Sequence, residues 1–100
     1  MSRENAIAKA VMQIASSQPN GLATFKRCYA EVPNHVRLTT AERATSVTRP
    51  REPMWHQLVR NIRSHHDADG NFLDRGLLRH VPRVGYEITP AGRRWLAAHP

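Results

Sequence analysis

Side chains that can bind anions or the edges of nucleobases gather within residues 53–65. If this segment is a helix, the side opposite its apolar residues centres on Gln57, Arg60 and Ser64. Further polar side chains flank that side, namely His56, Asn61 and Arg63. Arginine can donate two hydrogen bonds to guanine or to a phosphate, and Asn or Gln can pair with adenine. Residues 55–66 hold no carboxylate, which favours an anionic partner; an ordinary solvent-facing helix surface is the alternative.

Arginines also gather on either side of this segment. Arg49 and Arg51 come just before it, where contacts with phosphate are expected at the start of a helix. Arg79 and Arg83 lie on a predicted hairpin, and residues 75–94 include only one acidic side chain. We expect the hairpin tip to reach phosphates or a minor groove. A solvated turn without a partner is the alternative.

The charge of the whole chain points the same way. Its 100 residues include 15 Lys and Arg against 8 Asp and Glu, a formal net charge of +7, and only Lys9 and Lys26 are lysines. An arginine-rich cationic chain favours nucleic acid as the partner, although a GC-rich genome would also favour arginine over lysine.

The one cysteine, Cys28, excludes an intrachain disulfide and fits a reducing compartment. No apolar run approaches the roughly 20 residues of a membrane span, so we expect a cytoplasmic, nucleoid-associated protein that does not bind membranes.

Patterns typical of enzymes or metal sites are weak. We find no Ser-His-Asp or Cys-His arrangement in a supporting motif and no glycine-rich phosphate loop. Asp67, Asp69 and Asn71 have the spacing that begins an EF-hand loop, but Phe72 stands where that loop needs glycine. Cys28 falls on an apolar helix face and is better explained as a small core residue. We therefore expect no catalytic residue, no cofactor and no metal site.

The hydrophobic pattern predicts one mainly helical α+β domain over residues 1–100. The predicted helices are 3–17, 25–32, a short one within 38–43, 53–65 and 90–98. Their predicted N-caps are Ser2 or Asn5, Thr24, Thr39 with Glu42 in a capping box, and Thr89. Residues 21–23 are predicted to be extended. Strands 76–81 and 86–89 are predicted to form a hairpin around the turn at 82–85.

The predicted core depends on the segment that carries the polar side chains. Trp55, Leu58, Val59 and Ile62 form an apolar stripe along it, and Pro53 suits its first turn. We expect these side chains to be buried together: Trp55, Leu58, Ile62, Leu77, Tyr86, Ile88 and Leu96. The alanine-rich first helix has two open roles, either pairing with a second copy in a homodimer or completing the core of the monomer.

A set of helices followed by a basic hairpin and a closing helix is the layout of a winged helix-turn-helix, with residues 76–89 as the wing. Several motifs resemble the N-terminal winged-helix domain of Mrr-type restriction proteins. They are Leu38-Thr39-Thr40-Ala41-Glu42-Arg43, Arg51-Glu52-Pro53, and Gly76-Leu77-Leu78 through Arg83-Val84-Gly85-Tyr86-Glu87-Ile88-Thr89-Pro90-Ala91-Gly92-Arg93. The resemblance covers about residues 36–97 and implies a DNA-binding domain. That family normally joins the domain to a nuclease, but nothing in this chain resembles the nuclease's spaced acid and Glu-x-Lys core.

The sequence therefore predicts a protein that binds double-stranded DNA, as a small transcriptional regulator. The helix 53–65 would enter the major groove, and the hairpin would lie on the adjacent backbone. Two alternatives stay open. One is a standalone specificity module of a restriction or modification system, and the other is a winged helix that binds proteins instead of nucleic acid.

Overall fold

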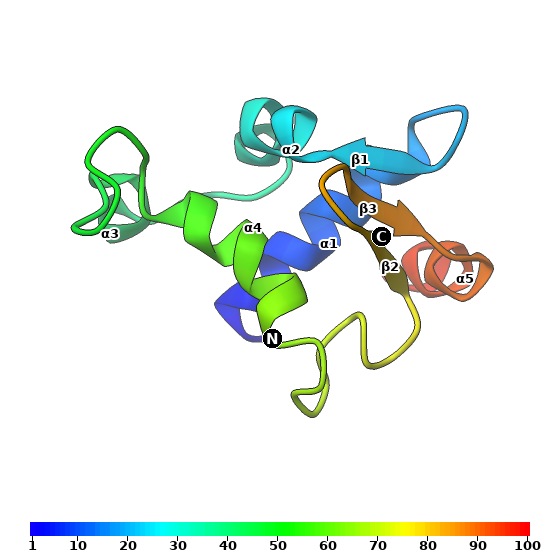
Figure 1. Ribbon diagram of the computed structural model, residues 1–100. Coiled ribbons are helices and arrows are strands. Elements are labelled where there is room, and N and C mark those ends of the chain that lie inside the picture. The colour runs from blue at the N-terminus through cyan, green and yellow to red at the C-terminus, as the bar shows by residue number, and fades with distance from the viewer.

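The computed structural model describes residues 1–100 and has the α+β class that the sequence predicted (Figure 1). In chain order its elements are α1 (Arg3–Ser16), β1 (Leu22–Thr24), α2 (Phe25–Glu31), the 3₁₀ helix η1 (Val32–Asn34), α3 (Thr40–Arg43), α4 (Trp55–Ser64), β2 (Leu78–Val81), β3 (Gly85–Ile88) and α5 (Pro90–Ala98). None of the helices combines the length and the apolar character that a membrane crossing requires. Figure 1 places α3 and the chain that follows it at one end of the molecule, and the sheet and α5 at the other.

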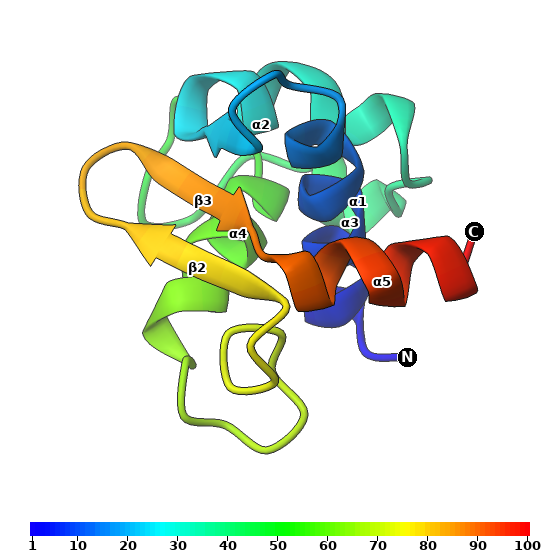
Figure 2. The same cartoon turned by 90° about the vertical axis from the view of Figure 1, so that its right-hand side faces the viewer.

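The sheet has three antiparallel strands in the order β1-β3-β2. The predicted hairpin forms β2 and β3, and the extended residues after α1 add β1 to its free edge. At Gly85 the chain of β3 passes so close to β1 that a Cβ atom would collide with the carbonyl oxygen of Ala23. Glycine is therefore required for this strand pairing. In Figure 2 the hairpin extends away from α5, with its tip at the far side from that helix.

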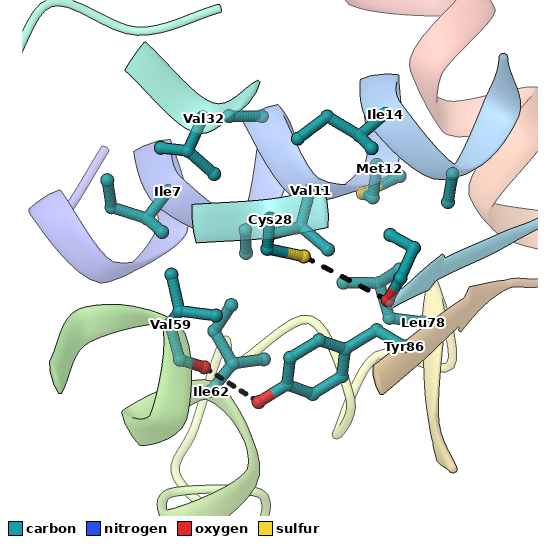
Figure 3. Close-up of a cluster of buried hydrophobic side chains, with 14 of the residues drawn as sticks. Ile7, Val11, Met12, Ile14, Cys28, Val32, Val59, Ile62, Leu78 and Tyr86 are labelled. Carbon is teal, nitrogen blue, oxygen red and sulfur yellow. Dashed lines mark hydrogen bonds between the residues drawn. The ribbon is translucent and has the colours of Figure 1, made fainter. Parts of the chain in front are cut away.

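The core is built around α1. Ile7, Val11 and Ile14 are fully buried, as their spacing predicted. In Figure 3 they face side chains of α2, α4 and the sheet, including Cys28, Ile62 and Tyr86. The alanines of α1 that lie in the core are Ala8, Ala10 and Ala15. Of the two roles left open for this helix, it has the second, completing the core of the monomer.

Cys28 is a core residue, as expected from its place on an apolar face. Its side chain is fully buried, and its Sγ lies 3.9 Å from the carbonyl oxygen of Ala23 (Figure 3). Burial raises the pKa of the thiol to about 12. The thiol is therefore protonated at neutral pH, which makes it a poor nucleophile.

The helix predicted from Pro53 begins two residues later, at Trp55. Pro53 instead pairs with Thr45 in an isolated β-bridge, because the preceding loop closes back on itself. Within α4, Trp55 and Ile62 are buried as predicted, but Leu58 is only half-buried. Leu58 lines a shallow groove open to solvent beside α3, so its predicted burial was wrong.

The C-terminal helix was also predicted to be more deeply buried than it is. Trp95 and Leu96 are only partly covered, because α5 lies on one side of the molecule and packs mainly against α1 (Figure 2).

Two residues of the loop after α4 take core positions that the sequence pattern did not predict. Phe72 is buried edge-on to Trp95, at 5.0 Å between ring centroids, and Asn71 donates a hydrogen bond to the carbonyl of Ile62 at 3.1 Å.

The predicted helix caps are present. Ser2, not Asn5, caps α1, and Thr24 and Thr89 accept the expected backbone hydrogen bonds at the starts of α2 and α5. Thr39 and Glu42 form the predicted capping box on α3.

Glu42 also links α3 to α1. Its carboxylate accepts hydrogen bonds from Arg3 Nε and Nη2 at 2.8 Å. The hydrogen bond from Arg3 is the main reason why the pKa of Glu42 falls to about 2. The short helix is thereby tied to the start of the chain.

Candidate nucleic-acid interface

The loop between α3 and α4 is closed by its own hydrogen bonds. Ser46 N–H donates to the carbonyl of Glu52 at 2.7 Å, and Met54 N–H donates to the carbonyl of Ala44 at 2.8 Å. The buried Ser46 hydroxyl accepts from the backbone N–H of Arg49 at 3.1 Å. The loop therefore has a defined shape, in which Arg49 and Arg51 are exposed.

A polar hollow lies between this loop and α4. It is lined by Thr48 and Arg49 from the loop, and by Gln57, Arg60, Asn61, Arg63 and Ser64 from α4. All of these residues are polar or charged, and most of them are ones that the sequence singled out for binding. The spacing of the five α4 residues places them on neighbouring turns of one helix side. We call this surface the α4 hollow.

Arg60 is less exposed than the sequence suggested. Its side chain is 17% exposed, and Nη1 donates to a carboxylate oxygen of Glu52 at 3.0 Å. Partial burial opposes its charge, but the nearby Tyr29 hydroxyl and Glu52 outweigh that effect and raise the pKa of Arg60. The sequence predicted a cationic helix side without a carboxylate, and this prediction missed Glu52. Glu52 precedes the helix in sequence, and the folded loop brings its carboxylate to Arg60.

His56 was predicted to flank the binding side but does not line the α4 hollow. Its ring stacks on Tyr29 at 4.1 Å between centroids and lies edge-on to Trp55 at 4.4 Å. Burial lowers the pKa of His56, so its ring is mainly neutral at pH 7. The ring therefore packs α4 against α2.

Arg63 connects the α4 hollow to the hairpin. Its guanidinium lies over the ring of Phe25, 5.3 Å from the centroid, in a cation–π geometry. The same residue lines a second hollow between the end of α4 and β2, together with His66, Leu73, Leu78, Arg79 and His80. The two hollows therefore meet at Arg63.

His80 lies beside Arg63 on the inner side of the hairpin. Its Nε2 is buried without a hydrogen-bond partner, and its ring packs near Phe25 and Tyr86. Burial, and then the positive charge of Arg63, lower the pKa of His80. The ring is therefore mainly neutral at pH 7, and it adds no charge to the surface around Arg63.

Tyr86 fixes the hairpin against α4, a contact that the sequence pattern did not identify. Its hydroxyl donates to the carbonyl of Val59 at 2.7 Å (Figure 3). The same hydroxyl accepts from the backbone N–H of Arg63 at 3.2 Å. Burial raises the pKa of this phenol, so the hydroxyl keeps its proton. One side chain of β3 thus bridges two successive turns of α4.

The predicted hairpin arginines differ in their surroundings. Arg79 lies opposite Glu87 in the strand register and donates to it from Nε and Nη2, at 2.9 and 2.7 Å. Arg83 is exposed at the tip and has no ion pair. Its φ of 66° lies in the left-handed region that favours glycine. The turn is closed by a 3.0 Å hydrogen bond from Val84 N–H to the carbonyl of Val81, which leaves the Arg83 side chain in solvent.

Acidic groups are distributed unevenly around these surfaces. Each glutamate of the chain lies within 3.2 Å of an arginine or histidine side chain. The aspartates, Asp67, Asp69 and Asp74, all lie in the loop after α4. Glu52 is therefore the acid paired with a residue of the α4 hollow, and the excess positive charge of Arg49, Arg51, Arg63 and Arg83 is not balanced by ion pairs.

Comparisons of this chain with family models, with curated proteins and with solved structures found no match.

The structure contains no group of three or more His, Cys, Asp or Glu side chains placed to hold a metal ion. What the surface offers is a set of hydrogen-bond donors and positive charges on a helix, a loop and a hairpin. Such a set can bind phosphates and base edges.

Proposed function

We propose that this protein binds double-stranded DNA in the cytoplasm through α4, its preceding loop and the β2–β3 hairpin. In this proposal the fold is a winged helix-turn-helix, α4 enters the major groove, and the hairpin is the wing that lies on the neighbouring backbone. The α4 hollow is the observation that carries the proposal. It gathers arginine, amide and hydroxyl groups, the types that read base edges, on one side of a helix.

The surroundings of the residues favour different roles within that surface. Gln57 and Asn61 can pair with adenine, and Arg60 can pair with guanine. All three side chains line the hollow from α4. Arg49, Arg51 and Arg83 are exposed and have no ion pair, which suits contacts with phosphates. Arg63 lies between the two groups and would contact the backbone where helix and hairpin meet.

The proposed DNA binding could serve more than one biological role. We propose first that the protein is a small transcriptional regulator. A specificity module that works with a separately encoded restriction or modification enzyme would use the same surface. Genome-wide occupancy separates these two from an architectural role, because discrete sites indicate sequence recognition.

The direct test measures binding to duplex DNA as salt is varied. The logarithm of the affinity should fall linearly with the logarithm of salt concentration, with a slope of about −0.9 for each phosphate contacted. A protein that binds no duplex at any salt concentration would contradict the proposal and would favour the protein-binding alternative.

Arg60 tests whether α4 reads bases. After selection of preferred sites from random duplexes, Arg60→Ala should lose about 1–3 kcal/mol on the preferred site and relax preference at one position. Arg60→Lys is the matched control, because it keeps the charge but lacks the planar fork. It should keep most non-specific affinity and still lose the preference. Equal losses on every duplex would assign Arg60 to a phosphate instead.

A further inference from the structure

Glu52 is an acidic residue at the edge of a surface that we propose to be built for an anion. Its side chain is 29% exposed and contacts Arg60, which lines the α4 hollow. Glu52 itself lines a neighbouring hollow of the loop, together with Arg49, Pro50 and Arg51. A carboxylate in that place repels phosphates, so an ordinary affinity-building surface would omit it. Its position therefore requires a reason other than affinity.

The main chain on both sides of Glu52 is held in place. The carbonyl of Glu52 accepts from Ser46 N–H at 2.7 Å, and its N–H donates to the carbonyl of Arg49 at 2.9 Å. Pro53, the next residue, takes part in the bridge with Thr45. The carboxylate is thus presented to α4 by a backbone whose conformation is set before any ligand arrives.

The ion pairs of the chain use different edges of the guanidinium. Arg3 and Arg79 bind their glutamates through Nε and Nη2 together, which occupies one whole edge of the fork. Arg60 binds Glu52 through Nη1 alone. The Nε and Nη2 edge of Arg60 therefore remains clear of this carboxylate. The Tyr29 hydroxyl also accepts a hydrogen bond from the guanidinium, and the donors that both partners leave free can donate to a base.

We infer that Glu52 is a positioning residue that sets sequence preference, because it holds the Nη1 end of Arg60 and so turns the remaining edge toward guanine. This inference rests on the proposed DNA binding. An arginine held before binding loses less side-chain entropy when it meets the base. Glu52 also repels phosphates, so it lowers affinity for every duplex and raises discrimination between duplexes.

The experiment compares Glu52 variants on the preferred duplex, on the same duplex with the guanine replaced, and on a random duplex. Glu52→Ala should reduce discrimination between the first two by roughly tenfold while raising affinity for the random duplex. Glu52→Gln should keep most of the discrimination, because its amide oxygen can still accept from Arg60 Nη1. Thermal melting followed by circular dichroism checks folding, and Glu52→Asp, which withdraws the carboxylate by one methylene, replaces the alanine variant if that one does not fold.

Glu31→Ala is the matched control. Glu31 pairs with Nη1 of Arg27 on α2, and neither residue lines the α4 hollow. The control removes an equivalent ion pair and should leave discrimination unchanged. If Glu52→Ala discriminates between the duplexes as well as the unmodified protein does, the inferred role of Glu52 is wrong, while the proposed DNA binding stands. The same holds if Glu52→Gln loses as much discrimination as Glu52→Ala. Absence of duplex binding by the unmodified protein would overturn the proposed function and this inference together.

Discussion

The α4 hollow and the hairpin tip both present arginine, but they hold it in different ways. In the hollow, Arg60 is 17% exposed and is tied to Glu52 at 3.0 Å. At the tip, Arg83 is exposed, has no ion pair and occupies a turn position with φ of 66°. A base edge must be met at a defined angle, whereas a phosphate can be met from many directions. The difference predicts that the hollow supplies sequence preference and that the tip supplies affinity for any duplex.

The largest effect should come from removing the support beneath the hollow. Ile62 is fully buried on the inner side of α4, so Ile62→Ala leaves a cavity and should lower the free energy of unfolding by about 2–5 kcal/mol. Urea denaturation measures this value. A loss below about 1 kcal/mol would mean that α4 does not depend on this side chain, and that the core does not support the hollow.

The next effect should come from breaking the link between the two regions. Tyr86→Phe removes the hydroxyl that bridges Val59 and Arg63. It leaves buried backbone groups with one partner fewer, so the free energy of unfolding should fall by about 1–3 kcal/mol. Denaturation followed by circular dichroism measures the loss. If hydrogen exchange in α4 and in the hairpin is unchanged in this variant, the hydroxyl does not couple the two regions.

A smaller effect, on binding alone, should separate the tip from the hollow. Arg83→Asn removes the charge and keeps a side chain that tolerates the left-handed conformation. Affinity should fall by a similar factor on all duplexes, and the salt slope should shrink by about one unit, while sequence preference stays the same. Arg37→Asn, at an exposed arginine outside both surfaces, is the control. A change in the selected sequence would show that the tip reads a groove.

The smallest effect should come from a residue that belongs to neither region. Glu42 has a folded-state pKa of about 2, below its usual 4.5, so the stability it supplies is complete above pH 4.5 and is lost as pH falls toward 2. Glu42→Gln should lower the free energy of unfolding by up to about 1 kcal/mol at pH 7. The loss is small because an ion pair with an exposed arginine, here Arg3, contributes little to stability. The difference from the unmodified protein should disappear near pH 2. Denaturation at both pH values tests this, and a cost that is equal at both would contradict it.

Local patterns predicted much of the fold. The caps at Ser2, Thr24, Thr39 and Thr89 depend on residues only three positions away, so the sequence contains both partners of each hydrogen bond. The hairpin and the α1 stripe follow from short periodicities. The start of α4 was misplaced at Pro53, because a loop that closes through backbone hydrogen bonds leaves little trace in residue types.

The site was predicted in its parts but not in its connections. The spacing of Gln57, Arg60 and Ser64 placed them on one side of α4, which is confirmed by the hollow that they line. The ion pair of Arg60 with Glu52 and the stacking of His56 on Tyr29 join segments that are separated in sequence. Such contacts depend on how elements pack, which one-dimensional periodicity does not contain.

The burial of Cys28 has a practical consequence. The chain has no other cysteine, and this thiol is fully buried with its pKa raised to about 12, so alkylating dyes at neutral pH should leave it unmodified. A protein carrying Arg83→Cys would therefore take up one fluorophore, at the hairpin tip, without prior removal of the native thiol. Energy transfer from that dye to labels placed along a duplex would measure where the tip lies on the helical repeat.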